Sequence, residues 1–312
     1  MRNSAIAVSG LRKTYGDKVV LDGIDLDVRA GTVFSLLGPN GAGKTTTVNV
    51  LSTLMKADGG SVRVADHDVA TEAKAVRAAI GVTGQFAAVD ELLTGQENLQ
   101  LMVDLNGVSA KDGKRIVTEL LERFDLVEAA RKPASTYSGG MRRKLDLAMT
   151  LVGNPKIIFL DEPTTGLDPR SRRTMWSIIR DLVAEGVTIF LTTQYLEEAD
   201  QLADWIAVLD QGRLVAQGTP DDLKRQIPGT HVRLRFTNVA LLDAAERLFP
   251  DATRDEEALT LRVPSDGGTT SLRALLDRLD EYSLSAEEFS VHTPDLDDVF
   301  LTLTGNTTEV IA

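Results

Sequence analysis

The 312-residue sequence has no cysteine, and histidine and aromatic residues are scarce, with three histidines and 5% aromatics. Without cysteine the chain can form no disulfide and has neither thiolate metal ligands nor a cysteine nucleophile. Long hydrophobic runs are absent too. No uncharged apolar segment has a length close to the about 20 residues that a helix needs to span a bilayer. The first 13 residues lack the apolar region of a secretory signal, so we expect a cytoplasmic protein.

Acidic residues outnumber basic ones, 46 against 34, which leaves a net charge of -12. Much of this charge is local, because residues 251–300 hold 13 acidic and 4 basic residues. Nucleic acid attracts proteins through clustered Lys and Arg, so this balance argues against a nucleic-acid partner. With 43% hydrophobic and 26% charged residues, the composition is that of a soluble globular protein, and the length suggests about two domains.

Buried strands alternate with helices along the first two thirds of the chain. Apolar runs at residues 32–37, 156–160, 187–193 and 205–209 have the pattern of strands buried on both faces, and helical segments separate them. This alternation predicts an α/β fold with a mostly parallel sheet. Residues 91–153 are mostly helical in pattern, so we expect a helical subdomain inserted in the sheet core.

Two helices have clear start signals. Asp168 suits the N-cap of a helix over 169–185, where a proline occupies the first turn. Thr94 and Glu97 have the spacing of a capping box ahead of an apolar run.

A second domain is expected from residue 223, which divides the chain into residues 1–222 and 223–312. The patterns follow one another there as strand, helix, strand, strand, helix, strand, the ferredoxin-like α+β order. A last helix that starts near Leu296 has one apolar face. This face suits burial in its own domain, contact with a second copy or contact with a partner, and the sequence leaves these open. The predicted strands are 231–236, 252–254, 258–263 and 288–292, and the helices are 241–248 and 271–282.

A glycine-rich phosphate loop follows the buried strand 32–37. Its pattern is G-x-x-x-x-G-K-[ST], and the amphipathic run 46–54 predicts a helix directly after it. Glycines let successive backbone N–H groups face the phosphates, and the helix N-terminus adds positive charge. We expect Lys44 to reach the β- and γ-phosphates and the Thr45 hydroxyl to bind Mg²⁺. The predicted nucleotide-binding residues of this segment are Gly38, Pro39, Asn40, Gly41, Ala42, Gly43, Lys44, Thr45 and Thr46.

Two carboxylates, Asp161 and Glu162, stand at the C-terminal end of the predicted strand 156–160. Ligands bind at that end of the strands in parallel α/β sheets. We assign Asp161 to Mg²⁺ binding and Glu162 to orienting and polarising the water that attacks the γ-phosphate. Asp-Glu at a strand end is also common in solvated turns, but the phosphate loop upstream favours a nucleotide site.

Ser138, Gly139 and Gly140 precede another predicted helix. A hydroxyl, bare backbone N–H groups and a helix N-terminus make a second anion site. The same residues also fit an ordinary serine N-cap with a flexible approach, and spacing alone favours that interpretation. If they do bind an anion, the simplest assignment is the nucleotide of another subunit.

Together these motifs resemble those of the ATP-binding cassette (ABC) ATPases. The phosphate loop corresponds to their Walker A motif, residues 157–162 to Walker B and residues 137–141 to the very specific signature motif. The resemblance covers about residues 5–220 and implies a P-loop NTPase fold with a mixed sheet core and a helical subdomain. It also implies Mg²⁺-dependent ATP hydrolysis in a homodimer that sandwiches two ATP molecules, each between Walker A of one chain and Ser138–Gly140 of the other.

The resemblance implies roles for three further residues. Tyr15 corresponds to the residue that stacks on adenine, although a tyrosine here also fits the edge of a sheet. Gln85 corresponds to the Q-loop glutamine, whose amide oxygen is a ligand of Mg²⁺ or of the attacking water. Asp168 belongs to the D-loop.

The sequence departs from the family pattern at two positions. Met141 replaces the usual glutamine of the signature, where the serine and glycines already supply the donors. Gln194 stands where the family has its switch histidine. Its amide can donate to the γ-phosphate but does not titrate near neutral pH. We therefore count Gln194 with Glu162 and Lys44 as catalytic, and expect no histidine-type limb near roughly pH 6–7 in the ATPase profile.

Residues 137–141, 192–196, 218–223 and 294–305 resemble the ATPase subunits of antibiotic exporters of the daunorubicin-resistance type. The resemblance implies a peripheral protein on the cytoplasmic side of the cell membrane, which drives export of a drug or antibiotic-like compound through a separate membrane permease subunit. Two other classes are a non-transport ABC ATPase that acts on DNA or ribosomes and a regulatory module with a vestigial ATP site. The acidic charge argues against the first, and intact Lys44, Asp161 and Glu162 against the second.

Overall fold

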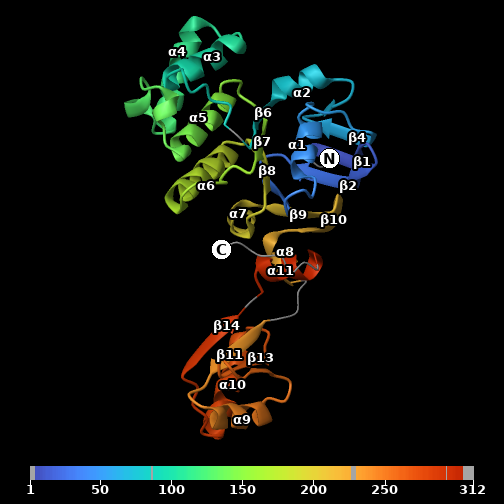
Figure 1. Ribbon diagram of the computed structural model, residues 1–312, viewed down its shortest axis with the longest axis vertical. Coiled ribbons are helices and arrows are strands. Elements are labelled where there is room, and N and C mark those ends of the chain that lie inside the picture. Colours follow the sequence, from blue (N-terminus) through green and yellow to red (C-terminus); the bar gives the residue numbers. More distant parts are fainter. Residues whose placement is uncertain (1–3, 86, 226–229, 293, 305–312) are drawn as a thin grey trace. The chain divides into compact units, whose positions relative to one another are not determined.

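The computed structural model describes residues 4–85, 87–225, 230–292 and 294–304 (Figure 1). The chain divides into two compact units, Met1–Pro220 and Asp221–Ala312. Within the described ranges, no helix combines the length and the apolar character that crossing a membrane requires.

A six-stranded sheet forms the centre of the first unit. All its strands run parallel except β10, which pairs antiparallel with β9 at one edge. Every residue of the three central strands is buried, as expected for strands covered on both faces. The predicted, mostly parallel sheet is confirmed. In spatial order its strands are β10 (Arg213–Gly218), β9 (Trp205–Asp210), β3 (Val33–Leu37), β8 (Thr188–Thr193), β7 (Ile157–Asp161) and β6 (Ile80–Thr83).

Successive residues of β7 point to opposite faces of this sheet, and each face has its own hydrophobic core. Ile158 and Leu160 belong to the core shared with the helices of residues 95–184. Ile157 and Phe159 belong to the other core, where the ring of Phe159 lies 5.6 Å from that of Phe190 on β8. Burial on both faces holds the carboxyl ends of β3, β7 and β8 in fixed positions along one edge of the sheet.

A four-stranded antiparallel sheet covers the second core, in the order β2 (Lys18–Arg29), β1 (Ser4–Tyr15), β4 (Gly59–Val64) and β5 (His67–Asp68). The helices α1 (Lys44–Leu51) and α2 (Ala73–Ala79) contribute side chains to the same core. We expected the first of these helices to continue to residue 54, and this was wrong. Thr53 has a left-handed backbone with φ of 66°, and the N–H of Met55 turns back to the carbonyl oxygen of Asn49 at 2.9 Å.

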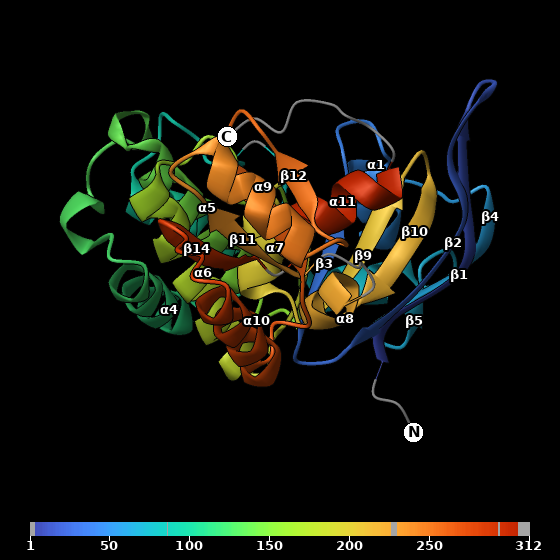
Figure 2. The same ribbon diagram turned by 90° about the horizontal axis from the view of Figure 1, so that it is seen from below.

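The predicted helical subdomain is present in the structure. It comprises α3 (Gly95–Leu105), α4 (Ala110–Arg123), two short 3-10 turns, η1 (Val127–Ala129) and η2 (Ala134–Thr136), and α5 (Gly139–Leu151). Thr94 and Glu97 form the expected capping box, in which the Glu97 carboxylate accepts the Thr94 N–H at 2.8 Å and Thr94 Oγ1 accepts the Glu97 N–H at 3.2 Å. Figures 1 and 2 show α4 and the antiparallel sheet at opposite sides of this unit.

Two helices follow β7 and β8 and cover the helical side of the central sheet, α6 (Pro169–Ala184) and α7 (Leu196–Leu202). Asp168 caps α6 as expected, because its Oδ1 accepts the N–H groups of Arg170 and Ser171, both at 3.0 Å. The buried face of α6 consists of Met175, Trp176, Ile179 and Leu182.

The second unit begins within α8 (Pro220–Arg225), at Asp221. Its sheet is antiparallel throughout and has the strand order β12-β13-β11-β14. The elements follow the predicted strand and helix order, and Leu296 and Val299 of the last helix are buried. Residue 305, the end of the segment that suggested an exporter, lies outside the described residues. The elements are β11 (His231–Arg235), α9 (Val239–Leu248), β12 (Thr253–Asp255), β13 (Thr260–Pro264), α10 (Thr269–Glu281), β14 (Glu288–His292) and α11 (Leu296–Thr304).

Candidate active site

The phosphate loop connects β3 to α1, and its backbone requires glycine. Gly41 and Gly43 have φ of 83° and 113°, in the region that side chains disfavour. A Cβ on Gly38 would lie 2.2 Å from the carbonyl oxygen of Leu209 on β9. The loop is therefore a tight turn at the carboxyl end of a parallel strand, where ligands bind in such sheets.

Lys44 opens α1, and its ammonium group is buried in the centre of this loop. Its side chain is 5% exposed, and Nζ donates to the carbonyl oxygens of Gly38 at 2.8 Å and Pro39 at 3.2 Å. Nζ also lies 3.4 Å from Oε1 of Glu162. Burial lowers the pKa of Lys44, and the negative charges of Glu162 and Asp161 oppose that shift. The structure thus brings together the predicted cation and both predicted carboxylates.

Glu162 follows the last residue of β7 and is buried. Its backbone is left-handed, with φ of 49°, which is uncommon for a residue with a side chain. Its second oxygen, Oε2, accepts hydrogen bonds from Gln85 Nε2 at 3.3 Å and Thr165 Oγ1 at 3.4 Å. Lys44 and Gln85 therefore approach different oxygens of one carboxylate.

Asp161 is held by a residue that the sequence analysis missed. Oγ1 of Thr192, on β8, donates to Oδ1 of Asp161 at 2.5 Å, and both side chains are buried. These residues are register partners in the parallel pair of β7 and β8. In the sequence, Thr192 is only a polar residue near the end of a predicted buried strand. Its contact with Asp161 becomes evident only once β7 and β8 are known to be neighbours.

Ser138 caps α5 by accepting the N–H of Met141 at 3.2 Å, so the N-cap interpretation holds within a single chain. Ser138 and Gly139 are exposed. A Cβ on Gly140 would lie 2.7 Å from Oγ of Ser171 on α6, which explains why a glycine fits here. Among the hydrogen bonds of the described residues, none joins this segment to Lys44 or Glu162.

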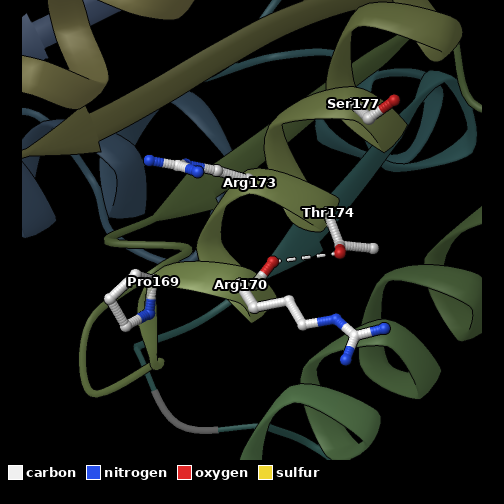
Figure 3. Close-up of a pocket in the computed structure, with 5 residues that line it drawn as sticks. All are labelled: Pro169, Arg170, Arg173, Thr174 and Ser177. Carbon is white, nitrogen blue, oxygen red and sulfur yellow. Dashed lines mark hydrogen bonds between the residues drawn. The ribbon is translucent and has the colours of Figure 1, made fainter.

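Within the part of the chain that the structure describes, no hydrogen bond joins Asp168 or the start of α6 to Lys44 or Glu162. Hydrogen bonds from the Ser171 side chain and backbone and from the Arg170 backbone lower the pKa of Asp168. A shallow surface hollow lies beside this turn of α6, and Figure 3 shows the Thr174 hydroxyl in it, bonded to the carbonyl oxygen of Arg170. None of the predicted nucleotide-binding residues lines this hollow. Its lining residues are Pro169, Arg170, Arg173, Thr174 and Ser177.

Tyr15 ends β1 and is 48% exposed. Its hydroxyl donates to Sδ of Met55 at 2.9 Å. The chain just before it is anchored by Asp58, which accepts hydrogen bonds from Lys13 Nζ at 2.8 Å and from the N–H and hydroxyl of Thr14 at 2.7 and 2.8 Å. The Lys13 and Thr14 hydrogen bonds lower the pKa of Asp58 to about 2. Tyr15 is about half exposed, and Lys13 Nζ lies 5.8 Å from the centre of its ring.

Gln194 lies in the turn between β8 and α7 and is half-buried. The hydroxyl of its neighbour Thr193 accepts the N–H of Tyr195 at 2.9 Å and so shapes this turn. Among the hydrogen bonds of the described residues, none joins Gln194 to the pair of Lys44 and Glu162.

The three histidines lie outside the group of Lys44, Asp161 and Glu162. His67 on β5 lies 3.1 Å from Glu72. In the second unit, the ring of His231 lies 4.8 Å from that of His292, which in turn lies 3.2 Å from Asp298. None of these residues belongs to the group formed by Lys44, Asp161, Glu162 and their partners.

The polar groups of this centre suit Mg²⁺ bound together with phosphates. Within the ranges that the structure describes, no cluster of three or more His, Asp or Glu side chains is arranged to hold a metal ion alone. Mg²⁺ is usually bound by one or two carboxylates together with substrate phosphates, so no such cluster is needed. Asp161 engages one carboxylate oxygen with Thr192, and the Thr45 side chain at the start of α1 is exposed.

Comparisons with known proteins agree with this geometry. A family described as "ABC transporter" matches residues 21–165. The chain is 49% identical over 308 residues to a daunorubicin resistance ATP-binding protein of Streptomyces coeruleorubidus, covering 98% of each chain. It is 48% identical over 307 residues to the daunorubicin/doxorubicin resistance ATP-binding protein of Streptomyces peucetius, covering 97% of this chain and 93% of that one. A solved ATP-binding cassette in a dimeric post-hydrolysis state, bound to ADP and Pi, matches with TM-score 0.63 and 25% identity, over 69% of this chain and 98% of that one.

Proposed function

The chain belongs to the ATP-binding proteins of ABC transporters, and on this basis we propose that it hydrolyses ATP to drive export of a drug or antibiotic-like compound. The observation that carries the proposal is the buried approach of Lys44 to Glu162, which joins the phosphate loop and the end of β7 in one centre. Phosphoryl transfer to water needs a cation for the phosphates and a group that orients the nucleophile. This centre contains both.

Lys44 and the loop backbone bind the nucleotide phosphates in this proposal. Backbone N–H groups of this loop and of the start of α1 face the phosphates. Burial disfavours the charged ammonium and lowers the pKa of Lys44, and a bound anionic phosphate opposes that shift. The half-exposed Tyr15 ring stacks on the adenine ring.

Three residues hold Mg²⁺ in this proposal: Thr45 through its hydroxyl, Gln85 through its amide oxygen and Asp161 through its carboxylate. When bound there, the ion would neutralise charge on the phosphate oxygens. Thr192 keeps Asp161 oriented, because its hydroxyl donates to one carboxylate oxygen and leaves the other for the site.

Glu162 orients and polarises the attacking water. Its carboxylate accepts hydrogen bonds from Gln85 and Thr165 and lies beside Lys44, so it has few alternative orientations. When the Lys44 ammonium turns to phosphate, one Glu162 oxygen becomes free to accept a proton from water. Gln194 adds an amide donor toward the γ-phosphate.

A second copy of the chain completes each site in this proposal. Ser138, Gly139 and Gly140 offer N–H groups and a hydroxyl at the start of α5, and no described hydrogen bond ties them to Lys44 in the same chain. The proposed dimer is head-to-tail, so that each of two ATP molecules is clasped by the loop of one chain and Ser138–Gly140 of the other. The solved cassette described as dimeric and bound to ADP and Pi supports the formation of a dimer.

Export is proposed because both curated relatives are named for daunorubicin resistance and match nearly the whole chain. The chain would act with a separate membrane permease, as a peripheral subunit on the cytoplasmic face. The second unit, Asp221–Ala312, would be an accessory or regulatory domain. The names of these relatives concern neither DNA nor ribosomes, so they give no support to the alternative of a DNA- or ribosome-acting ATPase.

Mixing two inactive variants tests the shared site. Lys44→Ala removes the loop cation, and Ser138→Arg blocks the signature segment. A mixed dimer of the two has one site with both parts intact, so the mixture should hydrolyse ATP although neither variant does so alone. Hydrolysis per wild-type molecule should also fall on dilution. Unchanged specific activity on dilution, with no recovery on mixing, would mean that one protomer is complete.

Drug export is tested separately, in cells that co-express the chain with its permease. Cells with the wild-type chain should accumulate less daunorubicin than cells with Glu162→Gln. Equal accumulation, with ATPase activity intact, would reject this substrate class and leave the ATPase proposal standing.

A further inference from the structure

Arg143 on α5 is buried, and its guanidinium group binds the backbone that carries Glu162. Nε donates to the carbonyl oxygen of Pro163 at 2.9 Å, while Nη2 donates to those of Asp161 at 3.1 Å and Glu162 at 3.4 Å. One side chain therefore binds three consecutive carbonyl oxygens at the end of β7. Only 8% of Arg143 is exposed, so water competes little for these bonds.

The same side chain reaches the segment of Gln85. Nη1 of Arg143 donates to the carbonyl oxygen of Gly84 at 2.7 Å and lies 3.4 Å from Oδ2 of Asp146. Asp146, one helical turn further along α5, accepts the N–H of Ala88 at 2.9 Å. The pair of Arg143 and Asp146 thus holds the backbone on both sides of Gln85.

This ion pair lies where charge is costly. Burial lowers the pKa of Arg143 and raises that of Asp146, and their mutual attraction opposes both shifts. A buried ion pair often stabilises a protein no more than apolar residues of the same volume. Here the five acceptors match the five N–H donors of a guanidinium group, and four of them are backbone carbonyls next to Gln85 and Glu162.

Glu162 has a backbone conformation that needs such support. A left-handed φ of 49° is strained for a residue with a side chain, and such strain persists where the surroundings impose it. Arg143 binds the carbonyl oxygens directly before and after Glu162, those of Asp161 and Pro163. Without these bonds the turn is free to relax, and the Glu162 carboxylate moves with it.

We propose that Arg143 is a positioning residue for ATP hydrolysis: it fixes Gln85 and Glu162 relative to each other and ties both to α5, whose first residues follow Ser138. The inference rests on the proposed function, because the position of Glu162 matters for rate only if Glu162 orients the attacking water. A shift of about 1 Å at a catalytic group costs on the order of 10²-fold in rate. The expected effect is therefore on kcat and leaves nucleotide binding intact.

Two variants at this position test the inference. Arg143→Lys keeps the charge, but a lysine ammonium cannot reach acceptors in both segments. The double variant R143M/D146L removes both charges together, so that neither is left unpaired in the interior. Both should lower kcat by about 10²-fold, while the ATP KM and the equilibrium affinity for labelled ATP stay within about twofold. The matched control is Arg123→Met, because Arg123 pairs with Glu185 at 2.8 Å elsewhere on the surface; its kcat should not change.

Two further readouts separate positioning from mere stability. In a Glu162→Gln background, Arg143→Lys should leave the residual rate unchanged, because there is no longer a base to position. Amide hydrogen exchange in Arg143→Lys should become faster in peptides that cover residues 84–88 and 161–165, and stay unchanged in α4.

The inference is overturned if both variants keep kcat within about twofold of wild type, if kcat and ATP affinity fall together, or if the losses from Arg143→Lys and Glu162→Gln multiply. If the wild-type chain has no ATPase activity that depends on Glu162, the proposed function is refuted instead. The exchange experiment does not depend on activity. Unchanged exchange in both segments overturns the positioning role in either case, and faster exchange confined to them supports it.

Discussion

The ammonium nitrogen of Lys44 lies 3.4 Å from Oε1 of Glu162, although the two residues come from the start of α1 and the end of β7. The strands that lead to them, β3 and β7, both pair with β8 in the sheet. Because these strands run parallel, their carboxyl ends share one edge, and the residues that follow them meet there. The contact therefore depends on strand order, and it brings together the cation and the carboxylate to which the proposed phosphoryl transfer assigns roles.

Glu162→Gln should retain ATP binding and lose turnover by about 10²–10⁴-fold, because the amide keeps the size of the side chain but cannot take a proton from water. Equilibrium binding of labelled ATP and single-turnover hydrolysis measure the two effects, and gel filtration with ATP should show a stabilised dimer. Glu185→Gln, at the surface pair with Arg123, is the control. Near wild-type hydrolysis by Glu162→Gln would assign the water-orienting role to another group.

Thr192→Val should lower kcat by about tenfold, because the Asp161 carboxylate loses the hydroxyl that orients it. Valine keeps the shape and suits a strand, so folding is retained at a cost of about 1.5–3 kcal/mol for the lost bond to a charged group. Steady-state kinetics over a range of Mg²⁺ concentrations measure the effect. The control is Thr188→Val on the same strand, whose hydroxyl accepts the N–H of Gly31 at 2.9 Å. If both variants lose the same activity, Thr192 has no special role at Asp161.

Asp58→Asn should raise the ATP KM by about threefold to tenfold with little change in kcat. The carboxylate anchors Lys13 and Thr14, which hold the backbone that presents Tyr15, and stacking on an aromatic ring is worth about 1–3 kcal/mol per base. Tyr15→Ala should show the same effect more strongly. Asp25→Asn is the control, because Asp25 accepts the N–H of Gly10 at 2.8 Å in the same sheet. A change in kcat alone would contradict this role.

The anchor at Asp58 also has a defined pH dependence. Its pKa is about 2 in the folded chain, below its usual value, so its stabilising contribution is complete above the unfolded pKa and disappears as pH falls toward 2. The ATP affinity should therefore owe no pH dependence to Asp58 across the neutral range.

Glu198→Gln should stabilise the first unit at alkaline pH. Glu198 is 1% exposed, and burial raises its pKa. Between the unfolded and folded pKa values the folded chain binds more protons, so the stability associated with protonated Glu198 is complete below the unfolded pKa and is lost as pH rises through the folded one. Glutamine mimics the protonated form at every pH. Urea unfolding followed by tryptophan fluorescence reports on this unit, because Trp176 and Trp205 both lie in it.

The advantage of Glu198→Gln over wild type should shrink as the pH is lowered from about 8 toward about 5. The bonds that Oε1 accepts from Thr164 at 2.7 Å and Trp176 at 3.2 Å are open to the amide oxygen as well. A difference in stability that is the same at both pH values would show that the substitution acts through packing and not through charge.

Local signals in the sequence predicted much of the fold. The capping box at Thr94 and the N-cap at Asp168 appear where the residues indicated, because capping depends on atoms within three residues of each other. The end of α1 was missed, because a left-handed residue at Thr53 leaves no mark in an amphipathic pattern. Ser138 fits both an N-cap and an anion site for the nucleotide of another chain. The structure of a single chain shows only the N-cap.

The sequence by itself determined the phosphate loop, the buried strands that deliver Lys44 and the two carboxylates, and the alternation that makes the sheet parallel. These features are formed by residues that are close together in the sequence. The spacing of those residues therefore indicates their chemistry. Only the tertiary structure decided that Thr192 orients Asp161 and that Arg143 binds the segments of both Gln85 and Glu162. These hydrogen bonds join residues far apart in the chain. Their donors bind backbone carbonyl oxygens or a side chain on a neighbouring strand, and no sequence motif specifies such partners.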